Sequence, residues 1–324
     1  MAEPAGVSDL PLPAGFLVGH ATTARGDSGC TVVICPPGAR GGVDVRGGGT
    51  GTRELEPLAP LANAEGPTAV LMTGGSAFGL GAADGVVGWL EQRGLGRWTP
   101  IGVVPLVPTA VVFDLTAGDP LARPGPVQGH AACEAARPGV PDRGRVGAGS
   151  GTAVGKVLGR EHATASGVGY AAQLLAGGVT VAAVAVANAF GDVLGADGSV
   201  IGGPLDDHGS LMRSAEVLTQ ISDPPDLAGH DQSTTLVCVC TDAPLDKRGC
   251  GIVARIAAAG IARAVDPAFT PIDGDVAFCV ASGTAPPPEP GFAVSWLLTL
   301  VGSAAATVTA AAIRDAVVQS AAGE

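Results

Sequence analysis

Residues 231–240 read DQSTTLVCVC, and within this stretch the sequence changes from polar to apolar residues. A polar run ends at Ser233, Thr234 and Thr235, and an alternating apolar run follows, which predicts a strand. Threonine is favoured on the pleated surface of a strand, so the hydroxyl side chains have a purely structural explanation. The functional explanation is that one of these hydroxyls is a nucleophile.

The composition is that of a large globular domain. The chain has 324 residues, of which 46% are hydrophobic and only 15% are charged, and it contains 51 glycines. A chain of this length can bury a sizeable core in one domain, built here from Ala, Val, Leu and Ile. The net charge is −12 and no run of Lys and Arg occurs, which argues against a nucleic-acid partner.

The N-terminus and the cysteines both favour a cytoplasmic location. The first fifteen residues lack the basic and apolar regions of a secretory signal. The seven cysteines lie among small or apolar residues, so we expect buried, reduced thiols. Neither the cysteines nor the five histidines have the spacing of metal ligands, and the sequence predicts no metal and no other cofactor.

One segment has the length of a membrane span. Residues 291–313 carry no charged side chain, but they are rich in Ala, Gly, Ser and Thr and poor in the residues that drive insertion. We therefore predict strand or turn structure followed by a buried helix from about Ser303 to Ser320, and no membrane association. A transmembrane helix is the alternative.

The remaining pattern alternates between strands and helices. Residues 30–48 read as strand, Pro-Pro-Gly turn and strand, which predicts a hairpin or meander. Residues 179–194 predict a strand that runs into a turn, and the segments after residue 234 predict a strand, an amphipathic helix and a final strand. Residues 203–233 are polar and contain prolines, which is typical of an exposed connector.

Four polar residues stand out against apolar surroundings. Lys156 is either a residue whose stem is buried and whose ammonium reaches water, or a buried amine with a shifted pKa beside a reacting group. Asn188 is either a turn-forming residue or an oxyanion donor. Asp273 and Asp275 flank Gly274 before an apolar strand, and taken alone they indicate a turn.

Two glycine-rich motifs do not meet the requirements of known catalytic loops. GAGSGTAVGK at 147–156 departs from a phosphate-binding loop at Ser150 and Val157, and GGSAFG at 74–79 lacks the second glycine of a nucleophile elbow. A Ser-His-Asp triad is a spatial arrangement that sequence does not show. A serine hydrolase that remains one intact chain therefore stays open as an alternative.

Taken in order, the motifs of this chain resemble the L-aminopeptidase/D-esterase family, which includes β-aminopeptidases and nylon-oligomer hydrolases. The motifs are VGH at 18–20, GVDVRGG at 42–48, TGGSAFGL at 73–80, VPLVPTAVVFDL at 104–115, VGAGSGTAVGK at 146–156, VAVANAFGDV at 184–193, TTL at 234–236 and DGD at 273–275. The resemblance runs from about residue 18 to the C-terminus. It implies a single α+β domain over residues 1–324, folded as a four-layer αββα sandwich resembling N-terminal-nucleophile hydrolases.

The resemblance also implies a self-cleaving precursor with a defined nucleophile. In the family, the nucleophile is the first residue of a hydroxyl doublet before the apolar strand, which is Thr234 here. Cleavage between Ser233 and Thr234 would give an α subunit of residues 1–233 and a β subunit of residues 234–324. Two departures from the family are Ser233, itself a candidate nucleophile where Asn or Gly is common, and Phe113, where some members have Tyr.

The roles of the other candidates follow from the same resemblance. Lys156, Asn188, Asp273 and Asp275 fall on the family's catalytic positions. A free α-amine has a pKa of about 7.7–8.0, so the amine of Thr234 can accept the proton of its own hydroxyl, alone or with Lys156. Asn188 would hold the oxyanion, and the two carboxylates would orient Lys156 and the hydroxyl doublet.

The predicted activity is hydrolysis of amide or ester bonds in small substrates. The candidates are peptides with D- or β-amino acids and oligomers of ω-amino acids such as 6-aminohexanoate. The rival hypothesis is a non-catalytic, uncleaved homologue that acts as a binding protein. Low charge and high apolar content predict leftover apolar surface, and the family resemblance implies a closed homo-oligomer, a tetramer or larger.

Overall fold

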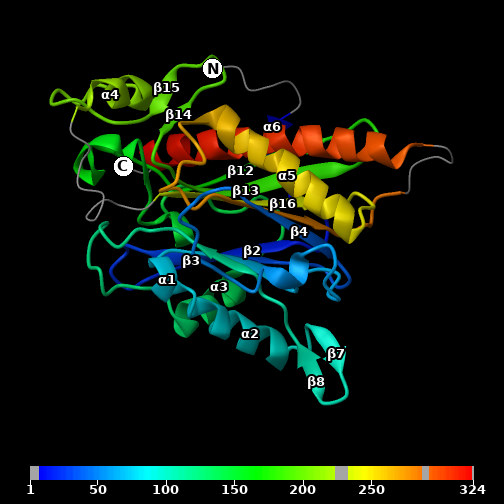
Figure 1. Ribbon diagram of the computed structural model, residues 1–324. Helices are drawn as coiled ribbons and strands as arrows, with labels where there is room; N and C mark the ends of the chain where they lie inside the picture. Colours follow the sequence, from blue (N-terminus) through cyan, green and yellow to red (C-terminus); the bar gives the residue numbers. More distant parts are fainter. Residues whose placement is uncertain (1–6, 223–232, 287–291, 323–324) are drawn as a thin grey trace.

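The computed structural model describes residues 7–222, 233–286 and 292–322, and it has four layers (Figure 1). Two β-sheets face each other at the centre. Helices α5 (Lys247–Ala264) and α6 (Val294–Ala321) cover one sheet, and helices α2 (Ala82–Gln92) and α3 (Pro126–Ala135) cover the other. The α+β class and the αββα sandwich are therefore confirmed.

The two central sheets are mixed, and each contains one parallel pair of strands. The first sheet has the order β1 (Val7–Ser8), β12 (Val168–Leu174), β13 (Thr180–Asn188), β16 (Thr234–Thr241), β18 (Val276–Ala281) and β4 (Arg40–Val45). The second has the order β2 (Leu17–Thr22), β3 (Gly29–Ile34), β6 (Ala69–Thr73), β9 (Thr109–Val111) and β5 (Thr52–Arg53). Strands β16 and β18 are parallel, as are β6 and β9.

Smaller elements decorate this frame. The remaining strands are β7 (Arg97–Thr99), β8 (Gly102–Val104), β10 (Ala153–Val154), β11 (Thr164–Ala165), β14 (Asp192–Leu194), β15 (Val200–Gly202) and β17 (Val265–Asp266). The remaining helices are α1 (Ser76–Gly79), α4 (Ser214–Gln220), η1 (Glu56–Leu58), η2 (Gly147–Gly149), η3 (Lys156–Leu158) and η4 (Arg160–His162).

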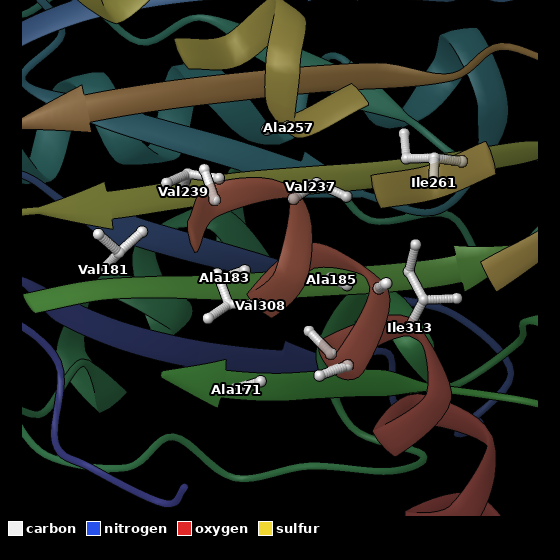
Figure 2. Packing of buried hydrophobic residues seen from close by; sticks show 14 of the residues in the cluster. Ala171, Val181, Ala183, Ala185, Val237, Val239, Ala257, Ile261, Val308 and Ile313 are labelled. Carbon is white, nitrogen blue, oxygen red and sulfur yellow. The ribbon is translucent and has the colours of Figure 1, made fainter. Parts of the chain in front are cut away.

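Alternation along β16 supplies side chains to two separate cores. Val237 and Val239 point toward α5 and α6, where they pack among alanines and valines (Figure 2). Cys238 and Cys240 lie on the other face, in the core between the two sheets. Successive strand residues face opposite sides, and the run TTLVCVCT is buried on both faces along its whole length.

Glycines let the outer helices lie directly on the first sheet. A Cβ on Gly169 in β12 would lie 1.9 Å from the carbonyl oxygen of Ala312 in α6. A Cβ on Gly42 in β4 would lie 2.2 Å from the backbone nitrogen of Gly251 in α5. No side chain fits at such distances, so these glycines set the spacing between sheet and helices.

The expected hairpin over residues 30–48 is wrong. Strand β3 belongs to the second sheet, whereas β4 pairs with β18 in the first. The Pro-Pro-Gly turn therefore carries the chain from one sheet to the other. The local pattern of strand, turn and strand is the same in both arrangements, and only the long-range pairing with β18 separates them.

The expected start of the last helix is also wrong, because α6 begins at Val294 rather than near Ser303. Residues 294–302 contain no proline, and packing of α6 against α5, β12 and β13 stabilises one continuous helix. By length and composition this helix could cross a membrane, but 61% of its apolar 18-residue stretch is buried inside the fold. Its buried face is part of the protein core.

The structure describes part of the predicted connector and all of the cysteines. The described part of the connector contains α4, whose first residue, Ser214, donates its backbone N–H to the buried carboxylate of Asp192. Residues 223–232 of the connector lie outside the described residues. All seven cysteines lie inside them, and each is buried with a free thiol, as expected.

Candidate active site

Thr234 lies at the start of a central strand and is buried. It is the first residue of β16, between β13 and β18, and only 3% of it is exposed. Asn188, the last residue of β13, is its direct partner in the antiparallel register. The strand pairing alone therefore brings together two candidate residues that are far apart in the sequence.

The Asp-Gly-Asp turn lies along the other side of Thr234. Ser233 forms a parallel bridge with Asp273, and its backbone N–H donates to the Ile272 carbonyl oxygen at 3.2 Å. The Gly274 N–H donates to the Ser233 carbonyl oxygen at 2.7 Å. The backbone from Ser233 to Thr235 is thus fixed against this turn, because the next amide along the chain also binds the turn.

That next amide, the Thr235 N–H, donates to Oδ1 of Asp275 at 2.6 Å. The second carboxylate oxygen of Asp275 accepts from the Phe269 N–H at 3.1 Å, and Oδ2 of Asp273 accepts from both the N–H and the hydroxyl of Thr270, at 2.9 and 2.6 Å. The carboxylates therefore position backbone segments around Thr234.

The environment of Asp275 changes its acidity. Burial is the main cause that raises its pKa to about 7, and the negative charge of nearby Asp273 acts in the same direction. The hydrogen bonds from the Thr235 and Phe269 amides oppose this rise. The carboxyl of Asp275 in the 273–275 turn therefore changes its protonation near neutral pH.

The side chain of Asn188 is held from two sides. Its Nδ2 donates to the carbonyl oxygen of Phe113 at 3.0 Å, and its Oδ1 accepts from the Ala153 N–H at 3.2 Å. Phe113 has no hydroxyl for the oxyanion role of the family's Tyr, but its backbone fixes Asn188. An amide group carries two N–H donors, so Asn188 retains the chemistry that its predicted role requires.

Lys156 is buried close to the end of β13. It is only 3% exposed and begins η3, and its backbone N–H donates to the carbonyl oxygen of Phe190 at 2.9 Å. The preceding Gly155 has a φ of +75°, which favours glycine. Burial excludes the interpretation of Lys156 as a side chain that extends into water.

The structure adds a segment that the sequence argument missed. The Arg46 N–H donates to the Asp275 carbonyl oxygen at 2.9 Å, and the Gly49 N–H donates to the Asp273 carbonyl oxygen at 2.8 Å. A Cβ on Gly47 would lie 2.1 Å from that same Asp273 oxygen. The adjacent glycines of GVDVRGG were the available signal, because glycine pairs often mark a close approach of two backbones.

The described residues show no group of three or more His, Cys, Asp or Glu side chains that could hold a metal ion. A hydroxyl, an amide and two carboxylates meet here, because Asn188 lies opposite Thr234 and the Asp-Gly-Asp turn lies beside it. The amine of Lys156 belongs to a buried residue whose backbone bonds to Phe190, two residues past Asn188. Such a set supports acyl transfer by a side-chain nucleophile.

Comparison with known proteins assigns the chain to a family. The model of peptidase family S58 matches residues 11–323. This chain belongs to peptidase family S58. It is 38% identical over 318 residues to an uncharacterized aminopeptidase of Mycobacterium tuberculosis, covering 92% of this chain and 90% of the relative. It is 31% identical over 273 residues to a 6-aminohexanoate-oligomer endohydrolase of Agromyces sp., covering 83% and 73%.

Solved structures of similar fold extend the comparison. A β-aminopeptidase of Burkholderia sp. has a TM-score of 0.70 at 24% identity, with 95% of this chain and 85% of that chain covered. The L-aminopeptidase D-Ala-esterase/amidase of Ochrobactrum anthropi has a TM-score of 0.64 at 19% identity, covering 94% and 84%, and is described as a variant of the Ntn hydrolase fold. This S58 chain therefore has that fold and is a hydrolase of amide bonds.

Proposed function

We propose that this S58 hydrolase is made as a precursor that cleaves its own Ser233–Thr234 bond and then uses Thr234 as the nucleophile. The observation that carries the proposal is the position of the Thr234 hydroxyl. Its Oγ1 donates to the carbonyl oxygen of Ser233 at 2.6 Å, inside a buried frame made by Asn188 and the 273–275 turn. A nucleophile is thus held beside the bond it has to cut.

After cleavage, Thr234 becomes an N-terminal residue with a free amine. The amine, with a pKa of about 7.7–8.0, is partly neutral near neutral pH and takes the hydroxyl proton as Oγ1 attacks a substrate carbonyl. Asn188 donates to the resulting oxyanion, and the charge of buried Lys156 stabilises it further. Asp273 and Asp275 keep the turn and the amide of Thr235 in place.

The proposed substrates are small peptides, amides or esters with D- or β-amino acids, or oligomers of 6-aminohexanoate. The names of the relatives support this range, because they include aminopeptidases and endohydrolases of 6-aminohexanoate oligomers. Hydrolysis of each substrate class by the purified protein, followed by chromatography of the products, ranks the alternatives.

Intact mass spectrometry of the purified chain tests the central claim. We expect two fragments, residues 1–233 and 234–324, and N-terminal sequencing of the small one should begin Thr-Thr-Leu. A start at Ser-Thr-Thr would move the nucleophile to Ser233. One intact mass with amidase activity would indicate an internal triad, and one intact mass without activity would indicate a binding protein.

We also propose a closed homo-oligomer, a tetramer or larger, in which the two fragments remain together. The proposed small fragment supplies β16 and β18, and these pair with β13 and β4 of the large fragment in one buried sheet. Apolar side chains remain exposed at the start of α6, including Val294 and Trp296, which is typical of an interface. A mass near 31.5 kDa by light scattering would contradict the oligomer.

A further inference from the structure

The carbonyl oxygen of Ser233 already has two donors in the uncut chain. It accepts from the Gly274 N–H at 2.7 Å and from the Thr234 hydroxyl at 2.6 Å. This carbonyl belongs to the bond proposed to be cut. When Thr234 Oγ1 adds to the carbonyl carbon, the carbonyl oxygen takes a negative charge. The hydroxyl is then no longer a donor, so the Gly274 N–H, which already points at this oxygen, is the donor that lowers the barrier.

We infer that the backbone N–H of Gly274 is the oxyanion donor for self-cleavage, a role that rests on the proposed function above. Thr234 Oγ1 adds to the Ser233 carbonyl carbon, and the carbonyl electron pair moves to the oxygen held by Gly274. The C–N bond then breaks, and the hydroxyl proton ends on the nitrogen of Thr234. The products of this step are an ester between Ser233 and Oγ1 and a free amine.

Water completes the reaction. Its oxygen adds to the ester carbonyl carbon, and the bond to Oγ1 breaks. One proton of the water goes to Oγ1 and the other is released to solvent. Ser233 then ends the large fragment as a carboxylate, and Thr234 begins the small fragment with both its hydroxyl and its amine. The same Gly274 N–H faces the Ser233 carbonyl oxygen in both steps, because this oxygen stays in place when the amide becomes an ester.

Only glycine permits this donor to lie so close to the nucleophile. A Cβ on residue 274 would lie 2.8 Å from Thr234 Oγ1 and 3.0 Å from the Gly49 carbonyl oxygen. The turn is held rigidly on both sides, by the hydrogen bonds of Thr270 to Asp273 and of Phe269 to Asp275. A donor held in this way does not have to reorganise as charge develops.

Gly274 and Asn188 flank Thr234 from different strands. Asn188 ends β13, whereas Gly274 precedes β18, and these strands lie on opposite sides of β16. The arrangement assigns one donor to each reaction: Gly274 serves the carbonyl of the chain itself, and Asn188 serves the carbonyl of a substrate. Loss of the Gly274 N–H should therefore slow processing and spare turnover by molecules already cut.

A backbone ester tests this assignment without adding a side chain. Glycolate in place of glycine at position 274 replaces the N–H by an ester oxygen. The matched control carries glycolate at position 49, which removes the Gly49 N–H bond to Asp273 in the same region but leaves Gly274 intact. Intact mass spectrometry over time should show self-cleavage at least about 100-fold slower for the 274 ester, with the control within about tenfold of the natural chain.

The outcomes separate this inference from the proposed function. If the natural chain stays uncut, the proposed function fails and this inference fails with it. If the natural chain is cut and both esters are cut equally fast, only the Gly274 assignment fails. Substrate turnover, normalised to the cut fraction, should match the control, and an equal loss of turnover would overturn the division between Gly274 and Asn188.

A second measurement covers the case in which the 274 ester does not fold. In the Thr234→Ala precursor, the Gly274 amide should exchange with solvent as slowly as the Thr235 amide, which donates to buried Asp275. Exchange of the Gly274 amide at the rate of an exposed loop would show that it does not hold the Ser233 carbonyl, and would overturn the inference.

Discussion

The two ends of the first sheet differ in the groups that lie there. At one end, where β16 and β18 begin, Thr234, Asn188 and the 273–275 turn are buried together. At the other end, about 20 Å away along the six residues of β18, a cavity of about 960 Å³ opens. Residues of the β3–β4 turn, residues 54, 56 and 57, and the segments 62–68, 94–97 and 104–106 line it.

The charged side chains at the cavity end are exposed to water or hold backbone groups in place. Arg40 and Glu65 form an ion pair at 3.3 Å with both side chains well exposed. Lys247 uses its ammonium to hold two backbone carbonyls, those of Pro57 and Ala62, at 3.0 and 2.6 Å. This cavity therefore lies away from Thr234, Asn188 and the 273–275 turn. The end that contains Thr234 differs in that its polar side chains are buried away from water and its hydrogen-bond donors are held in fixed positions.

Replacing the proposed nucleophile, Thr234, should produce the largest effect. Thr234→Ala should abolish self-cleavage and reduce amide hydrolysis at least about 10⁴-fold, because one hydroxyl serves both acyl transfers. The matched control is Thr235→Val, which removes the neighbouring buried hydroxyl and keeps the backbone bond to Asp275. Appreciable amidase activity in Thr234→Ala would remove this residue from the mechanism.

The two buried lysines give a direct comparison between the ends. Lys156→Met should slow both cleavage and hydrolysis by about 10²–10⁴-fold, through lost charge and proton transfer. Lys247→Met should lower the melting temperature and leave the activity per folded molecule unchanged, because its ammonium only holds two carbonyls. Rates and melting curves of both variants check this, and wild-type kinetics in Lys156→Met would contradict the catalytic role.

The raised pKa of Asp275 predicts opposite pH trends for activity and stability. Self-cleavage should speed up as the pH rises through about 7, because the ionised carboxylate holds the Thr235 and Phe269 amides more strongly. Between pH 4 and 7 the folded carboxyl keeps a proton that the unfolded chain has lost, so its contribution to stability falls as the pH rises.

Asp275→Asn isolates the stability trend. Other buried carboxyls, such as Asp114 and Asp192, also have pKa values raised by burial, so the natural chain shows their sum. The difference in melting temperature between the natural chain and Asp275→Asn should therefore change between pH 4 and 7. A constant difference across that range would show that Asp275 does not titrate there.

The smallest effect is expected from the ion pair at the cavity end. Glu65→Ala removes the exposed partner of Arg40 and should change the free energy of unfolding by less than about 1 kcal/mol. Self-cleavage should proceed at the rate of the natural chain. A large change in that rate would show that the two ends of the sheet are coupled.

Local sequence predicted the elements that carry the site. The alternation after Thr234 predicted β16, the apolar run ending at Asn188 predicted β13, and the apolar residues after Asp275 predicted β18. These signals are local, because a strand buried on both faces must be apolar at nearly every position. The family resemblance supplied the choice of Thr234, Lys156, Asn188 and the two aspartates.

Tertiary structure alone decided which elements meet. Residues 30–48 have the pattern of a hairpin, yet β4 does not pair with β3 and pairs with β18 instead. Helix α6 extends back to Val294 because it packs on α5. The hydrogen bond from Gly274 to the Ser233 carbonyl exists only because β16 and β18 run parallel in one register. Pairing of distant strands depends on total burial across the sheet, and residues near each other in sequence carry no record of it.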